Sequence, residues 1–431
     1  MFQTLKNAWK IPELRNKLLF TLLIILIYRL GASIPVPYVN TEVLNYYSQY
    51  SGTVLDFMSL LSGGAMAQAT LFALSVSPYI TASIVMQLLT VAIPPLERMA
   101  KEEDGKKKIN AITRYVTIAL ALVTAYGYTM LLNTNGWLLV EEGEIFPFFV
   151  IIACYCAGAS LIMWLAEKIN EFGIGNGISI ILFANIIASI PSMCMTLWYW
   201  IMPSTGFSVG GLIGAIAVVI ATLGLTVLSV WFTNSERKIP IQYAKRVVGR
   251  KMYGGQGTHL PLKMNMTGVM PIIFASSIVS IPATIVQMFN MDTNYNFAWF
   301  VDQFLQTNRW PYILIYLLLL VAFSYFYIMI SFNPVEVANN IRNNGGAIPG
   351  IRPGRPTSDF IKKVLNKITL IGAGFLAIVA GLPMIVGMFS TQFASLAFGG
   401  SSLLIIVGVA LETIRDIEAQ ITMRNYKGFL D

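Results

Sequence analysis

Long apolar runs separated by short polar stretches set the pattern of this sequence. A membrane-spanning α-helix takes about 20 mostly apolar residues, and ten runs approach or exceed that length. They lie at residues 18–36, 70–91, 112–132, 147–167, 178–198, 210–232, 268–289, 311–332, 367–389 and 400–414. No polar linker divides the runs into separate blocks. The pattern therefore predicts one all-α polytopic membrane domain with ten transmembrane helices.

Lysine and arginine are distributed unevenly between the polar stretches. With ten spans both termini lie on one side, and that side receives 27 of the 29 Lys and Arg residues. The exceptions are Arg309, on the opposite side, and Arg29, inside the first run. Because basic residues are enriched on the cytoplasmic side of membrane proteins, we expect both termini in the cytoplasm. These cytoplasmic segments account for the net charge of +8.

Two of the expected cytoplasmic loops are unusually long, at residues 233–267 and 333–366. The first mixes basic and β-branched residues from Tyr243 to Lys251, which indicates a protruding hairpin. The second contains Arg352 between Pro and Gly residues, whose turns hold the arginine outward. Far fewer charges would orient the helices, so we interpret both loops as binding surfaces. The alternative is that they serve topology alone.

The stretch between the first two runs, residues 37–69, lies on the opposite side. It contains an apolar segment, residues 54–65, which is too short to cross the bilayer and includes Gly63 and Gly64. A re-entrant segment belongs inside a protein cavity, because irregular backbone exposed to lipid is costly. An amphipathic helix on the outer surface or a helix in a soluble cap fits the residues equally well.

Several kinds of catalytic and transport site are missing from the sequence. There is no GxxxxGK[ST] phosphate loop, and the glycines at residues 173–177 lack the strand that precedes a nucleotide site. The three cysteines lie in apolar runs and the single histidine has no partner, so no metal or other cofactor is expected. Ion-coupled carriers place carboxylates or histidines at mid-membrane, where this chain has almost none. The pattern favours a passive conduit that is not an enzyme; a ten-helix secondary transporter of a small solute is the alternative, and a structural scaffold ranks third.

Short motifs along the chain, in this order and between these runs, resemble the SecY and Sec61-alpha family of protein translocase channels. The resemblance extends from about Asn16 to about Arg424. Its motifs are residues 31–37 (GASIPVP), 77–84 (SPYITASI), 173–179 (GIGNGIS), 243–246 (YAKR), 258–263 (THLPLK), 268–277 (GVMPIIFASS) and 349–354 (PGIRPG). Each motif is weak alone, and their combination is specific.

The resemblance implies two pseudo-symmetric halves of five helices around a central hourglass pore. Residues 1–198 would form the N-terminal half and residues 210–431 the C-terminal half, with a hinge at residues 199–209. Family proteins close the pore with a ring of aliphatic side chains, and an outer segment, here about residues 55–67, acts as a plug. The ring maps onto Ile80, Ile84, Leu182, Ile186, Ile273 and Ile405, with the positions on the fifth and tenth helices open to a shift of one residue. The plug residues are Leu55, Phe57, Met58, Leu60, Leu61, Gly63 and Gly64.

The resemblance also implies partners, since the chain carries no motor of its own. The ATPase SecA or a translating ribosome would dock on the two basic loops, SecE would brace the hinge side, and SecG would be accessory. The docking residues would be Lys245, Arg246, Arg250, Lys251, Arg352 and Arg355. Arg355 stands where some relatives have an acid, which leaves its role open. Polypeptides with signal sequences would cross the bacterial cytoplasmic membrane, or leave the channel sideways into lipid between the second and seventh helices.

Overall fold

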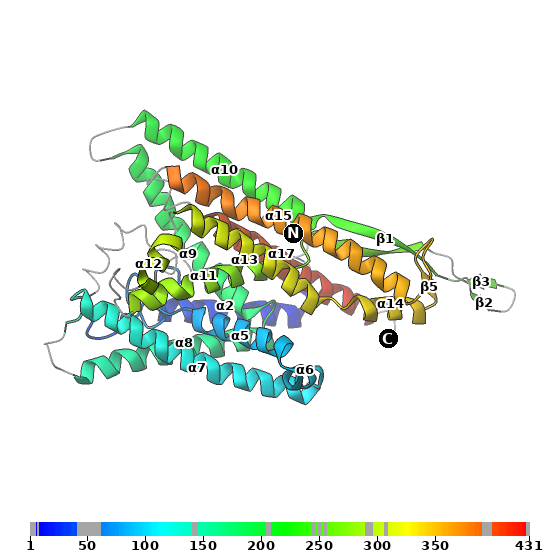
Figure 1. The fold of residues 1–431 in the computed structure, drawn as a ribbon, viewed down its shortest axis with the longest axis horizontal. Coiled ribbons are helices and arrows are strands. Elements are labelled where there is room, and N and C mark those ends of the chain that lie inside the picture. The colour runs from blue at the N-terminus through cyan, green and yellow to red at the C-terminus, as the bar shows by residue number, and fades with distance from the viewer. Residues whose placement is uncertain are drawn as a thin grey trace.

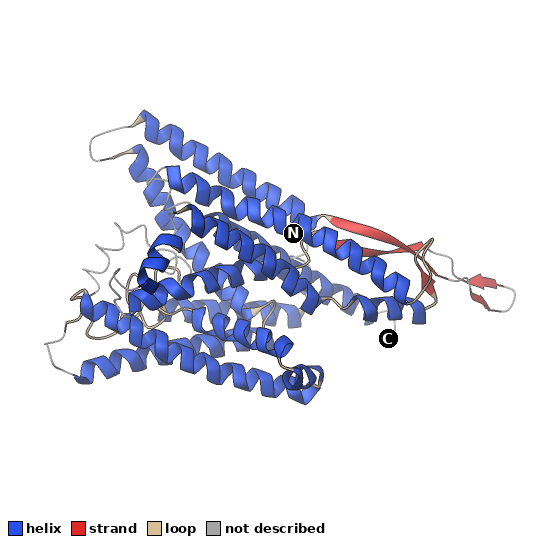
Figure 2. Ribbon diagram, in the orientation of Figure 1, coloured by secondary structure: helices blue, strands red, loops and turns tan. Residues whose placement is uncertain are grey.

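Long helices run side by side through most of the molecule, and a small β-structure extends from one end (Figure 1). The computed structural model describes residues 6, 8–40, 62–139, 145–203, 208–243, 246–248, 251–253, 257–288, 296–305, 309–389 and 399–427. Within these residues, Figure 2 shows strands only at that one end, so the apolar part of the fold is helical.

Each of the ten apolar runs has a helix at its position. The first five are α2 (Pro12–Gly31), α5 (Ser77–Ala92), α7 (Glu103–Thr134), α8 (Ile145–Phe172) and α9 (Gly177–Ile201). The next five are α10 (Val209–Asn234), α11 (Met270–Met288), α13 (Trp310–Ser331), α15 (Arg355–Phe389) and α17 (Gly399–Lys427). The second run was predicted too long, because residues 70–76 are mostly turns and α5 begins only at Ser77.

Among the shorter helices of the described residues, three lie between longer ones. They are α6 (Pro94–Lys101), α12 (Asn296–Phe304) and α14 (Pro334–Asn343). Pro94 and Pro95 begin α6, since proline is favoured in the first turn of a helix and cannot continue a preceding one. The chain therefore turns through 109° between α5 and α6.

Length and composition single out six helices in the described part of the chain that could cross a membrane. A seventh is added if α5 and α6 form one bent span. Charged residues, such as Arg15 near the start of α2 and Arg415 in the middle of α17, keep those two helices out of this count. Helix α11 counts only as a shorter apolar helix. The chain is thus a multi-pass membrane protein, and the number of ten crossings stays a prediction.

The long helices form two groups linked by contacts. In one, α7 packs against α5 and α8, and α8 packs against α2 and α9; in the other, α17 packs against α10 and α15, and α13 packs against α11 and α15. Between the groups, α9 contacts α10 and α17, whereas α11 contacts α5 and α7. A central region is therefore bordered by α5, α9, α11 and α17.

The two long loops meet in one β-structure. Strand β1 (Glu236–Tyr243) pairs antiparallel with β4 (Gly257–Lys263), from Glu236 opposite Lys263 to Gln242 opposite Gly257. Strand β5 (Gly346–Ala347) comes from the second loop and pairs with the other edge of β1. Strands β2 (Arg246–Val248) and β3 (Lys251–Tyr253) form a separate two-stranded ladder. The hairpin expected in the first loop is thus present, beside a fold that is otherwise mostly helical in the described residues.

Candidate functional site

The six aliphatic residues expected at a constriction come from four helices. Ile80 and Ile84 lie on α5, Leu182 and Ile186 on α9, Ile273 on α11 and Ile405 on α17. All six are at most 5% exposed and belong to one cluster of buried hydrophobic residues. The two pairs are spaced by four residues, which places both members on the same face of their helix.

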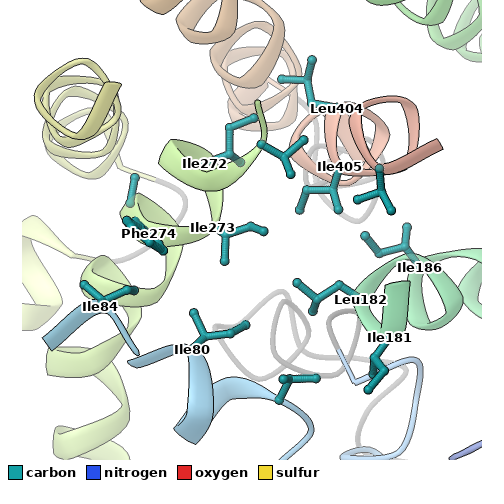
Figure 3. Packing of buried hydrophobic residues seen from close by; sticks show 14 of the residues in the cluster. Ile80, Ile84, Ile181, Leu182, Ile186, Ile272, Ile273, Phe274, Leu404 and Ile405 are labelled. Atoms are coloured by element: carbon teal, nitrogen blue, oxygen red, sulfur yellow. The ribbon is translucent and has the colours of Figure 1, made fainter. Parts of the chain in front are cut away.

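Figure 3 shows how these side chains lie relative to one another. Ile80, Leu182, Ile186, Ile273 and Ile405 point toward a common central region. Ile84 lies beside Phe274 and farther from that region. The structure thus brings five of the six together in a group that we call the aliphatic ring, and places Ile84 at its margin.

Neighbouring positions on the same helices do not join the ring. Ile181, Ile272 and Leu404 are also buried, but they lie on other sides of α9, α11 and α17 (Figure 3). A one-residue shift of register would therefore exchange ring residues for residues that pack between helices.

The chemistry of the aliphatic ring is that of a barrier without polar groups. Aliphatic side chains offer no hydrogen bonds to water or ions, and a hydrophobic constriction can close by expelling water. Their flexibility lets them spread around a passing chain without recognising its sequence. Such a ring suits a conduit for many different polymers better than a site for one solute.

The outer segment expected to act as a plug falls mostly outside the described residues. Leu55, Phe57, Met58, Leu60 and Leu61 are among those outside. Gly63 and Gly64 are described and have φ angles of +65° and +86°, which glycine adopts readily and other residues rarely do. The chain after them forms turns until α5 begins at Ser77.

Contacts with neighbouring helices fix residues 62–76 in place. The Tyr128 hydroxyl on α7 donates a 2.6 Å hydrogen bond to the Met66 carbonyl. The Val36 amide donates to the Ala69 carbonyl at 3.1 Å, and the Leu71 amide to the Ile34 carbonyl at 2.9 Å. These bonds tie the segment to α7 and to the chain that follows α2.

Arg29 has no role in the sequence-based assignment, yet it joins three parts of the N-terminal group. Its guanidinium donates to the Ala184 carbonyl and, at 3.3 Å, to Asn185 Oδ1 on α9. Asn185 Nδ2 in turn donates to Ser75 Oγ at 3.2 Å. A Cβ built on Gly63 would lie 3.0 Å from the guanidinium nitrogens. A charge inside an apolar run is costly unless it has partners, and that rule could have pointed to Arg29.

Comparison with known proteins places this architecture in a family. The family model described as SecY matches residues 70–414. The chain belongs to the SecY family. Among curated relatives, the SecY subunits of Streptomyces coelicolor and Halalkalibacterium halodurans are 43% and 40% identical, and each match covers all of both chains. Both are named protein translocase subunit SecY.

Solved structures share the fold at low sequence identity. One described as "The structure of a protein conducting channel" is 18% identical, with a TM-score of 0.64, and the match covers 94% of this chain and 92% of that one. Sec61 in a canine ribosome-channel complex is 16% identical, with a TM-score of 0.60 and the same coverage. The bundle and its emerging β-structure are thus a SecY-family fold.

The expected docking residues of this SecY-family chain lie at its β-structure and the start of α15. Lys245 and Arg250 are outside the described residues, while Arg246 and Lys251 belong to β2 and β3. Arg352 is exposed, in a segment where Gly350 and Gly354 have φ angles of +80° and +104°. Its carbonyl accepts a 2.9 Å hydrogen bond from Thr357 Oγ1, which links the turn to α15.

Arg355 is also exposed but faces different surroundings. It begins α15 and lines a groove of about 620 Å³ between α13, α14 and α15, together with Arg342 and Lys362. The two arginines of the motif region therefore belong to different surfaces.

Proposed function

We propose that this chain is the protein-conducting channel of a Sec-type translocase. Unfolded secretory proteins would pass through the aliphatic ring, and membrane proteins would leave sideways between α5 and α11. The observation that carries the proposal is the convergence of aliphatic side chains from α5, α9, α11 and α17 at the centre of the bundle. Membership of the SecY family supports the same function.

The ring explains how such a channel conducts polypeptide and still limits leakage. Burial of one aliphatic side chain is worth about 1.5–3 kcal/mol, so contacts among a few of them separate reversibly. A chain in transit replaces these contacts with contacts to its own side chains. The plug, about residues 55–67, would close the outer funnel when no polypeptide is present.

A secondary transporter of a small solute is the second candidate, and the site disfavours it. Such carriers hold their solute with polar groups and broken helices near the middle of the membrane. The five converging residues are all aliphatic. In the described part of the chain, Arg29 is bonded to neutral acceptors on α9 and lies outside the ring. The geometry therefore supports polymer conduction over solute binding.

Partners would supply the energy for movement. We infer that SecA or a translating ribosome docks on the β-structure and the loop of Arg352, with SecE at the hinge and SecG as an accessory subunit. The union of the two basic loops through β1 and β5 supports one shared docking surface. Two solved structures of similar fold are ribosome-bound channel complexes. The distribution of basic residues supports a bacterial cytoplasmic membrane with both termini inside the cell.

The test is a crosslink from the ring to a polypeptide in transit. A variant without Cys154, Cys156 and Cys194 receives one cysteine at Ile80, and a secretory precursor is stalled during SecA-driven transport. We expect an adduct that requires ATP and a signal sequence. A cysteine at Leu314, which is 65% exposed on α13, serves as the control and should give none. If no adduct forms at Ile80 or Ile273 while transport proceeds, the pore assignment is wrong.

A further inference from the structure

The part of α17 that follows Ile405 touches the beginnings of α11 and α9, which also carry ring residues. Gly408 packs so closely against Val269 that a Cβ at Gly408 would overlap the valine side chain. Val269 precedes α11, and its carbonyl accepts a 3.2 Å hydrogen bond from the Ile273 amide. One contact on α17 thus reaches the first turn of α11 and the ring residue on it.

A second contact on α17 reaches the turn that begins α9. A Cβ built on Gly175 would lie 3.3 Å from Thr413 Oγ1. Gly175 has a φ angle of +77°, and α9 begins two residues later with Leu182 in its second turn. Movement of α17 along its axis would therefore press on the start of α9.

Arg415 joins the same part of α17 to the end of α10. Its guanidinium donates to the Thr233 carbonyl at 2.8 Å and to Asn234 Oδ1 at 3.0 Å. The carbonyls in the last turn of a helix lack partners within the helix and carry partial negative charge, so a cation there is favourable. Strand β1 begins at Glu236, directly after this helix end.

The base of the hairpin follows directly on this end of α10. The Met264 amide donates to the Ser235 carbonyl at 2.9 Å, and Glu236 pairs with Lys263 across the strands. Lys263 lies within electrostatic reach of Arg415 and Asp416. Partial burial lowers the pKa of Lys263, the Arg415 charge lowers it further, and the carboxylates of Asp416, Glu236 and Glu412 oppose the change. Ser235 and Met264 thus close the base of the hairpin directly after the end of α10 that Arg415 holds.

We propose that Arg415 is a positioning residue that couples the β1–β4 hairpin to the aliphatic ring through α17. The inference rests on the proposed function. Ile405 precedes Arg415 by ten residues on one helix, which is about 15 Å of rigid rod. A partner that moves the hairpin moves α17 with it, and α17 shifts Ile405 directly and α9 and α11 through Thr413 and Gly408. The Arg415 guanidinium is hydrogen-bonded to α10, so we expect this residue to transmit movement and not to bind the partner.

The experiment separates partner binding from partner-driven transport. The complex with SecE and SecG is reconstituted in liposomes, and SecA is titrated while transport of one secretory precursor is measured. We expect Arg415→Gln to lower the maximal rate at least about fivefold, the lower range of typical coupling between sites. The SecA concentration for half-maximal rate should stay as in the unmodified complex. Arg415→Lys, which keeps the charge, should recover part of the rate.

Two further variants keep the test decisive if Arg415→Gln assembles poorly. Asn234→Ala removes one acceptor of Arg415 at an exposed position, and should lower the maximal rate in the same direction by a smaller factor. Arg309→Gln, at the start of α13 and outside the proposed docking surface, should leave the rate unchanged. The coupling would be overturned if Arg415→Gln and Asn234→Ala both left the maximal rate unchanged. It would also be overturned if the two variants weakened SecA binding and did not lower the maximal rate. Absence of transport by the unmodified complex would refute the proposed function instead.

Discussion

Arg29 lies in the apolar part of α2, and its hydrogen bonds to α9 offset the cost of a charge there. Hydrogen bonds to a charged group contribute about 1.5–3 kcal/mol. Arg29→Ala removes the donors to the Ala184 carbonyl and Asn185 Oδ1, so we expect a loss of about 2 kcal/mol in the free energy of unfolding. Chemical unfolding of the purified protein in detergent measures it. The neighbouring Leu30→Ala, at a side chain 60% exposed, is the control and should change the stability less. Equal stability of both variants would contradict the assigned bonds.

A polar side chain in the aliphatic ring should weaken its barrier to ions. Ile273→Asn places an amide where the described ring has only aliphatic groups, and the amide can hold water in the constriction. A barrier lowered by about 1.4 kcal/mol raises flux about tenfold. We expect an increase of at least this size in the resting conductance of the reconstituted complex. Leu314→Asn, on the exposed face of α13, is the control; a similar rise there would point to general loosening of the bundle.

The aliphatic ring shows which individual residues the sequence could assign to a constriction and which it could not. Periodicity does not distinguish Ile273 from Ile272 or Leu182 from Ile181, because each of these helices is buried on more than one side. The family motifs supplied the positions, and the structure supplied their directions (Figure 3). Asn185 escaped the sequence reasoning, since one amide in an apolar run carries no pattern until Arg29 is seen beside it.

At the scale of elements, close approach between α8 and the turns before α5 sets a limit on side-chain size. A Cβ at Gly158 would overlap the Leu71 carbonyl, whereas a Cβ at Gly374 in α15 meets nothing within 4 Å. Overpacking typically costs about 1–3 kcal/mol, so Gly158→Ala should lower the free energy of unfolding by that amount. Gly374→Ala should be neutral or stabilise by up to about 1 kcal/mol, since alanine favours helix. Similar effects from the two variants would show that the contact at Gly158 is not tight.

Helix positions followed from apolar length, but the start of α5 did not. Residues 70–76 are as apolar as a membrane-spanning helix. Ala69 and Ser75, however, adopt positive φ angles that composition does not predict. A bridge between Pro35 and Thr70 and the bonds to residues 34–36 impose these turns. Such contacts join residues about 35 positions apart, which local patterns do not report. The pairing of β5 with β1 is a longer-range example, because it joins two loops separated by α11 and α13.

At the scale of the whole molecule, the two long loops pack together as one body. Ile239 and Ile241 of β1, Leu262 of β4, and Ile341 and Ile348 of the second loop share a single buried cluster. The same cluster includes Ile361 and Leu365 of α15, which fixes the body to the bundle. A partner that binds either loop therefore acts on both, and on the helices beneath them.

Binding of a ribosome to this body should depend on salt, because arginines that contact RNA phosphates release counterions. If Arg352 makes one such contact, Arg352→Gln lowers the affinity and reduces the slope of log affinity against log salt by about one. Titration of ribosomes onto the labelled complex at several salt concentrations measures the slope. Arg309→Gln is the matched control, since Arg309 begins α13 on the expected outer side and is paired with Asp302. A slope that changes equally in both variants would mean that the salt dependence arises from the overall charge of the chain. A change confined to Arg352→Gln assigns the phosphate contact to the turn before α15.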